Sequence, residues 1–271
     1  MARNADKLDL IVFHTAIQLE AVADARGTKE DEKQPPYQYK RAWQLSELGW
    51  QTSPLAFESP ELLQLDRTEE HKNSQAVLSA IAKLALLHSL TLRAEGVPGL
   101  QGCLDHTFAP PSKLQSLKIY GNLVTLPIWI TQLQNLAKLK LRSTQLKLAP
   151  SMEILGKLPH LAILRLWKNS FLQSKKILFD FQQSTFPSLV VMELKDQEGL
   201  KSLNFMQGAM PRLELLQINN CMHIDNNGFS GVSSLLSLKE VMLMGDHNKE
   251  LMKNLRDQLA LNQNKPVLKG A

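Results

Sequence analysis

The sequence predicts an α/β solenoid: an irregular, curved stack of short repeats with a parallel concave sheet and a C-terminal helical cap. Three observations predict it. A leucine pattern returns every 22 to 28 residues over most of the chain. A polar or sulfur-bearing residue follows several copies at the same offset. Prolines, which interrupt the hydrogen-bond ladder of a central strand, fall between the copies.

The repeated unit has a predicted strand at its centre. The segment LQSLKI, beginning at Leu114, has a second copy, LAKLKL, beginning at Leu136. Both fit L-x-x-L-x-L-x-x-N/C-x-L, the template of leucine-rich repeats. Seven units fit in all, and the others begin at Leu87, Leu161, Leu189, Leu213 and Leu238. Because no unit can bury its own leucines, we expect neighbouring units to stack and share one core.

The ninth template position is an independent test of the repeat. Four units carry a suitable residue there: Asn122, Thr144, Asn169 and Cys221. Such side chains can point inward and satisfy the polar backbone of the turn. The other units carry Glu95, Gln197 and Asp246, and we expect their turns to be irregular. Cys221 is thereby explained as a structural residue.

The segments between strands should return the chain along the convex side. From Leu126, the stretch LPIWITQLQNL places apolar residues three or four positions apart, which predicts a short helical turn. Near the C-terminus, Leu251, Leu255 and Leu259 are spaced by four among polar residues, which predicts an amphipathic helix. We expect this helix to cover the exposed edge of the last repeat.

These patterns divide the chain into three parts. Residues 76–248 form the predicted solenoid and residues 249–271 its cap. Residues 1–75 have repeat-like apolar spacing interrupted by a charged stretch at about 24–40 that is nearly free of large apolar residues. We expect degenerate repeats with a disordered insertion, and a separate N-terminal module is the alternative.

Composition places the chain in a broad class. The formal charge is +5, but the first 75 residues contain 9 Lys+Arg against 13 Asp+Glu and the remainder 22 against 13. The basic second part suggests an acidic partner. Two cysteines are too few for a disulfide scaffold, which favours a reducing compartment. We find neither a signal peptide nor an apolar run of membrane-spanning length, so we expect a soluble cytoplasmic protein without membrane contact.

Alternation along each strand identifies a candidate contact surface. Residues that flank each L-x-L core face outward on the concave side. In the central units they form a basic patch beside two aromatic residues, and amide and apolar residues follow in later units. The candidate contact residues are Lys118, Tyr120, Lys138, Lys140, Arg142, Arg165, Trp167, Gln217 and Met242.

This surface favours contact with a protein. Arginine and aromatic side chains anchor interfaces, and positive charge speeds the capture of an acidic partner. Leu215, Met242 and Met244 suit a protein surface better than a phosphate surface. The chain lacks a recognised nucleic-acid motif, which argues against nucleic acid. A solubilising face with no specific partner is the remaining alternative.

Catalytic chemistry finds no support in the sequence. There is no G-x-S-x-G elbow and no H-E-x-x-H pair. His106 lies three residues after Cys103, but no second pair has the spacing of a zinc site. We therefore expect no catalytic residue, no metal and no cofactor, and a hydrolase or metal enzyme within the N-terminal part is the alternative.

The chain resembles one family from about Leu62 to the C-terminus. The relevant stretches are APPSKLQSLKIYGNLVTLPIWITQLQNLAKLKLRSTQL, LPHLAILRLWKNSF, FPSLVVMELKDQEGLKSL and GAMPRLELLQINNC. They resemble the C-terminal leucine-rich-repeat region of plant coiled-coil nucleotide-binding (NB-LRR) disease-resistance proteins, especially those of grasses. The resemblance implies recognition of pathogen effectors, or restraint of a nucleotide-binding (NB-ARC) module, in plant innate immunity.

The chain also departs from this family. It has no G-x-x-x-x-G-K-[ST] phosphate loop and no preceding coiled coil, so ATP binding and self-contained signalling do not carry over. A C-terminal fragment, a truncated product and a stand-alone decoy or adaptor all fit this departure. The alternative outside immunity is a leucine-rich-repeat scaffold that joins signalling proteins.

Overall fold

The computed structural model describes residues 78–270, except residue 80 and residues 95–98, 106–108 and 173–175. Before residue 78 it describes the backbone of three strands: β1 (Lys7–Phe13), β2 (Ala16–Ala21) and β3 (Leu63–Gln64). The insertion expected at 24–40 lies outside the described residues. Trp129 and Trp167 are the tryptophans within them.

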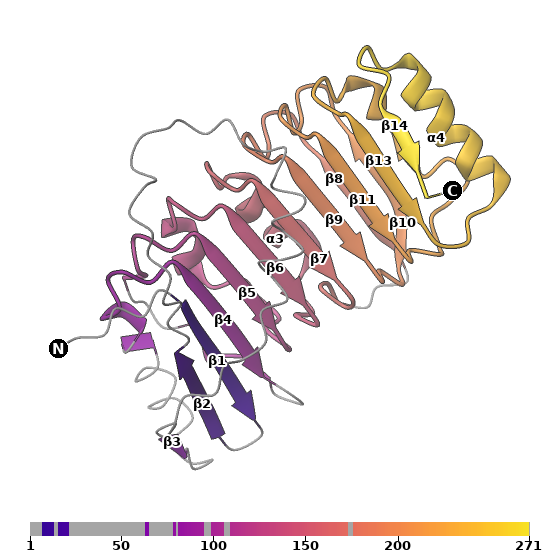
Figure 1. The fold of residues 1–271 in the computed structure, drawn as a ribbon. Helices are drawn as coiled ribbons and strands as arrows, with labels where there is room; N and C mark the ends of the chain where they lie inside the picture. Colours follow the sequence, from indigo (N-terminus) through magenta and orange to yellow (C-terminus); the bar gives the residue numbers. More distant parts are fainter. Residues whose placement is uncertain are drawn as a thin grey trace.

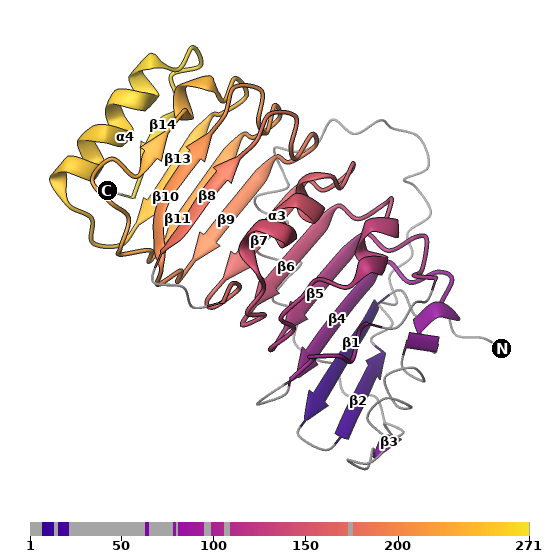
Figure 2. The same cartoon turned by 180° about the vertical axis from the view of Figure 1, so that it is seen from behind.

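The described chain folds into two layers (Figures 1 and 2). The main sheet has eleven strands in the order β14-β13-β11-β9-β7-β6-β5-β4-β1-β2-β3. All seven predicted repeat strands are neighbours in this sheet and pair in parallel. They are β4 (Ser89–Ala94), β5 (Ser116–Tyr120), β6 (Lys138–Arg142), β7 (Ile163–Trp167), β9 (Val191–Lys195), β11 (Leu215–Asn219) and β13 (Glu240–Met244). The predicted solenoid with a parallel sheet is confirmed.

The core lies between the main sheet and the convex layer. Register places template leucines opposite one another, so Leu117 pairs with Leu139 and Leu139 with Leu164. None of these three side chains is measurably exposed. This shared core supplies the apolar burial that a single unit lacks.

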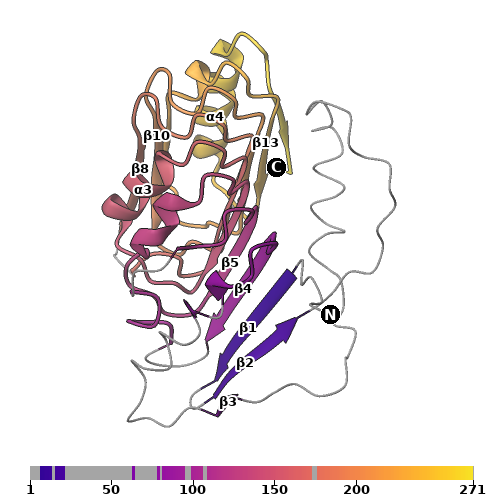
Figure 3. The same ribbon diagram turned by 90° about the vertical axis from the view of Figure 1, so that its left-hand side faces the viewer.

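The convex layer changes character along the chain. It begins with η3 (Ile128–Gln132), the predicted helical turn, and α3 (Leu148–Gly156). A second, three-stranded sheet of β8 (Ile177–Phe181), β10 (Leu200–Phe205) and β12 (Phe229–Ser230) follows, which the repeat template did not predict. Figure 3 shows this layer beside the main sheet.

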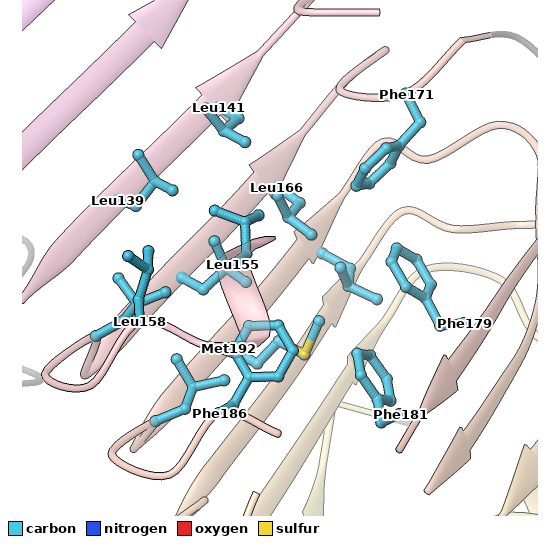
Figure 4. Packing of buried hydrophobic residues seen from close by; sticks show 14 of the residues in the cluster. Leu139, Leu141, Leu155, Leu158, Leu166, Phe171, Phe179, Phe181, Phe186 and Met192 are labelled. Carbon is cyan, nitrogen blue, oxygen red and sulfur yellow. The ribbon is translucent and has the colours of Figure 1, made fainter. Parts of the chain in front are cut away.

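Aromatic packing accompanies the change to the second sheet. The rings of Phe179 and Phe181 stack with 5.5 Å between their centres, and Phe181 stacks on Phe205 at 5.0 Å. Phe171 meets Phe179 edge to face. Figure 4 shows Phe171, Phe179 and Phe181 packed beside leucines of the main sheet, which include Leu166. The larger rings fill the space between the layers where helices give way to strands.

The inward polar positions correct part of the sequence analysis. Gln197 was expected to give an irregular turn, but it is buried and donates to Leu166 O at 3.0 Å. In the β7 unit, Ser170 is the buried residue in place of Asn169, and it donates to Leu141 O at 3.0 Å. Thr144 Oγ1 donates to Ser170 O as expected, at 2.8 Å. Glu95 lies outside the described residues.

The C-terminal end is covered by two elements. Helix α4 (Lys249–Leu261) begins at Asn248, whose side chain accepts a hydrogen bond from Leu251 N. Its buried residues include Leu255, and the helix contacts β12 and η4 (Val232–Ser234) on the convex layer. The predicted helix is confirmed. The edge of the main sheet, however, is extended by β14 (Val267–Lys269), which pairs in parallel with β13.

At the N-terminal end, the main sheet changes direction. β1 pairs with β4 in parallel, like a repeat strand. β2 is antiparallel to β1, and β3 is antiparallel to β2. The sheet therefore continues beyond the solenoid units with strands of both directions.

Candidate functional site

The nine candidate residues share the outer face of the main sheet, which lies opposite the core and is here named the concave face. Strand register arranges its side chains in rows that cross the sheet. The middle row runs Lys118, Lys140, Arg165, Glu193, Gln217 and Met242. A second row contains Tyr120, Arg142 and Trp167, and a third contains Ser116, Lys138 and Ile163. Figure 1 shows the seven strands side by side.

The basic patch is less uniform than the sequence implied. Arg142 is exposed, Lys138 is half-buried, and Lys140 and Arg165 are only 6% and 8% exposed. Arg165 Nε lies 3.1 Å from Glu193 Oε2. This ion pair was missed, although aligning the L-x-L cores would have placed the two residues opposite each other. It offsets one of the predicted patch charges.

Aromatic rings hold several of the cations. Lys140 Nζ lies 3.0 Å from the ring centre of Trp167 and 5.6 Å from that of Tyr120. Lys195 Nζ lies 4.9 Å from the Trp167 ring, and Arg93 Cζ lies 5.1 Å from the Tyr120 ring. Cations in these positions are attracted to the negative ring faces. Arg93 and Lys195 thus join the site, and neither was among the candidate residues.

Burial, and after it neighbouring positive charge, lowers the pKa of a lysine in the basic patch. Burial lowers the pKa of Lys140 to about 7, and repulsion from Arg165, Lys118 and Arg142 adds to the effect. Glu193 acts in the opposite direction. A carboxylate that docked beside Lys140 would favour its charged form.

The end of the concave face over β11 and β13 combines apolar side chains with uncharged polar ones and has little net charge. Gln217 Nε2 lies 3.0 Å from Met242 Sδ. Met242 is half-buried and Met244 is 43% exposed. The acidic residue of this end, Glu240, pairs with Lys269 of β14 at 2.8 Å. This end offers thioether and amide groups, which adapt to varied apolar and polar surfaces.

Other reactive groups do not gather into a site. Among the residues that the structure describes, no three His, Cys, Asp or Glu side chains are placed to hold a metal ion. Cys221 is buried, and burial raises its pKa to about 11, which keeps the thiol protonated at neutral pH. Of the Cys103–His106 pair, His106 lies outside the described residues. None of the described helices has the length and apolar character to cross a membrane.

A parallel sheet of L-x-x-L-x-L units, with a continuous outer face of charged, aromatic and amide residues, defines a leucine-rich-repeat protein. A family model described as "Leucine-rich repeat region" matches residues 60–268. The chain belongs to this family.

Similar proteins of known class point to one group of leucine-rich-repeat proteins. The chain is 30% identical over 225 residues to disease resistance protein PIK6-NP of Oryza sativa subsp. japonica, which covers 76% of this chain and 21% of the relative. It is 30% identical to disease resistance protein Pik-2 of the same organism (58% and 17% covered), and 33% identical to RPP8 of Arabidopsis thaliana (35% and 10%). The resemblance to plant disease-resistance proteins is confirmed. The chain spans about a fifth of the length of the first relative.

Proposed function

We propose that this chain is a non-catalytic recognition domain of plant innate immunity that binds another protein through its concave face in the cytoplasm. The partner is a pathogen effector or the NB-ARC module of a receptor. One observation carries the proposal: in a chain related to disease resistance proteins, the candidate contact residues lie in adjacent rows on one face of the main sheet.

The mechanism of contact follows from the charges and the rings. Lys138 and Arg142 flank Lys140 on β6 and steer an acidic surface toward the sheet. Trp167 and Tyr120 supply rigid contact area at low entropic cost, as aromatic hot spots do. Because the charge of Arg165 is paired with that of Glu193, Arg165 contributes less to the attraction of the partner than the other basic residues do.

A binding assay with the NB-ARC module of a related receptor tests the proposal. We compare the intact chain with Lys138→Glu/Arg142→Glu at low and high salt. The control is Lys147→Glu/Lys253→Glu, which changes the net charge equally at exposed residues before α3 and on α4.

We expect salt-sensitive binding that the concave variant weakens by about tenfold or more and the control leaves nearly unchanged. Equal loss in both variants would mean that net charge, not the concave face, governs binding. No binding to this module or to any effector tested would favour the scaffold function outside immunity.

A further inference from the structure

We infer that the concave face, in the binding role proposed above, takes a single protein segment with two chemically different ends. Carboxylates of this segment lie over β5 and β6, and its apolar side chains lie over β11 and β13. The inference rests on the proposed function and specifies the chemistry of the partner.

The basic end is defined by β5 and β6. Their outward residues are Ser116, Lys118, Tyr120, Lys138, Lys140 and Arg142, which include four basic residues and no acid. Arg93 of β4 extends this charge at the Tyr120 ring. Arg142 is exposed and Lys138 half-buried, so both are within reach of a partner. Carboxylates are the groups in proteins that complement such a surface.

An ion pair marks the boundary of the basic end. Glu193 of β9 faces Arg165 of β7, and the two side chains are only 9% and 10% exposed. Lys195 lies near the Trp167 ring, on the side of the basic end. Beyond this boundary, positive charge no longer dominates the face.

The apolar end continues across the next strands. Ile163, Val191 and Leu215 are opposite one another in register, so an apolar band leads from β7 to β11. On β13 this row continues with Glu240, which pairs with Lys269, while Met242 and Met244 lie in the two neighbouring rows and Met244 is 43% exposed. Thioether side chains fit apolar groups of different shapes. A phosphate chain would gain nothing from this end, which favours a protein segment over a polyanion.

The distance between the two ends suits one segment. Three strand intervals separate β6 from β11, and four separate β6 from β13. At about 4.8 Å per interval the ends are about 14 to 19 Å apart. An extended peptide covers this span with about four to six residues and a helix with about ten to thirteen. Because the two ends differ, the segment can dock in only one orientation.

Two labelled synthetic peptides of identical composition test the inference by fluorescence anisotropy. In the block peptide, glutamates form one end and leucine and methionine the other, whereas the shuffled peptide alternates them. Linear polyphosphate is the probe for a simple polyanion. The protein variants are Lys138→Glu/Arg142→Glu, Met242→Gln/Met244→Gln and the control Lys147→Glu/Lys253→Glu.

We expect the block peptide to bind about tenfold more tightly than the shuffled peptide, and both concave variants to weaken it. Polyphosphate should respond to the lysine and arginine changes alone. Equal binding of the two peptides, or block-peptide binding that Met242→Gln/Met244→Gln leaves unchanged, overturns the inference.

The proposed function has a separate readout. Suppose that the NB-ARC module binds the intact chain, and that this binding is lost in Lys138→Glu/Arg142→Glu but kept in Met242→Gln/Met244→Gln. Recognition by the concave face is then supported, and the inference of a partner segment with two different ends is wrong. If the module and effectors bind independently of both variants, the proposed function itself fails.

Discussion

Lys140 lies between two aromatic rings and among other cations, and its proton is coupled to folding. Its pKa is lowered from 10.5 to about 7, first by burial and then by Arg165. Between these two values the unfolded chain binds a proton that the folded chain has released. The free energy of unfolding therefore rises as pH rises from about 7 to 10.5, and this gain is lost again as pH falls from 10.5 to about 7.

Replacing Lys140 by Met should remove this pH dependence. We expect the unfolding free energy of Lys140→Met to rise less than that of the wild type between about pH 7 and pH 9. The difference in unfolding free energy between the variant and the wild type should favour the variant most near pH 6. Urea unfolding at these pH values measures the difference. Lys113→Met, at an exposed position, is the control. Parallel pH curves for Lys140→Met and the wild type would contradict the expectation.

The position of the contact residues could be predicted, but their environment could not. Strand alternation alone placed Lys118, Arg142 and Trp167 on one face. Aligning the L-x-L cores of consecutive units places Arg165 opposite Glu193, but the close contact of the two charged groups also depends on how both side chains pack in the folded sheet. Burial of Lys140 likewise depends on side chains from three strands, so a single repeat unit does not reveal it.

At the scale of the elements, a left-handed residue follows each repeat strand from β5 to β13 within two positions. These residues are Gly121, Ser143, Asn169, Asp196, Asn220 and Gly245, with φ between 52° and 123°. Glycine, asparagine and aspartate tolerate this conformation better than other residues. The turn therefore starts directly after the strand in five of these six units and one residue later in the β7 unit, which helps to keep successive strands in register.

Substitutions at two glycines distinguish the cost of backbone strain from the cost of a steric collision. Gly121 has φ 115°, and a Cβ there would collide with the carbonyl oxygen of Ala94 in β4. Gly102 has φ 75° with no atom within 4 Å of an added Cβ. We expect Gly102→Ala to lower the unfolding free energy by about 1 kcal/mol and Gly121→Ala by about 3 kcal/mol or more. Chemical denaturation measures both, and equal losses would show that the collision is relieved.

The convex strands escaped prediction for a physical reason. The ILFDF sequence of β8 is a short run with apolar residues at four of its five positions, and the exposure of its residues alternates, with Leu178 and Asp180 outward. That is a strand signal, but the template describes one strand per unit and assigns the return segment no fixed structure. β14 has only three residues, too few for any periodicity. Asn169 and Ser170 are adjacent, and sequence alone does not decide which one turns inward.

As a whole, the solenoid is held by contacts between neighbouring units. Such a stack loses stability locally, because each unit is supported by the next. Helix α4 supports the last units through Leu251, Leu255 and Leu259, which are all nearly or fully buried. Damage to α4 should therefore spread from the C-terminal end.

Leu255→Ala tests this directional loss. The side chain is 0% exposed, and its removal should lower stability by about 2–5 kcal/mol. Amide hydrogen exchange should quicken in β11 and β13 before it changes in β5 and β6. Leu261→Ala, at a residue 74% exposed, should change neither. Uniform acceleration over all strands would show that the stack unfolds as one unit.

The rate at which the Cys221 thiol can be labelled reports the opening of one repeat. Its thiol is fully buried on the inner side of the turn after β11, with Sγ 3.9 Å from Leu194 O. Burial keeps it protonated, so an alkylating reagent can label it only after the turn has opened and water has entered. When labelling is slow relative to reclosing, the labelling rate of Cys221 reports the equilibrium population of the opened turn in an unmodified chain. A partner docked on the concave face of β11 would slow the labelling of Cys221 without touching the sulfur.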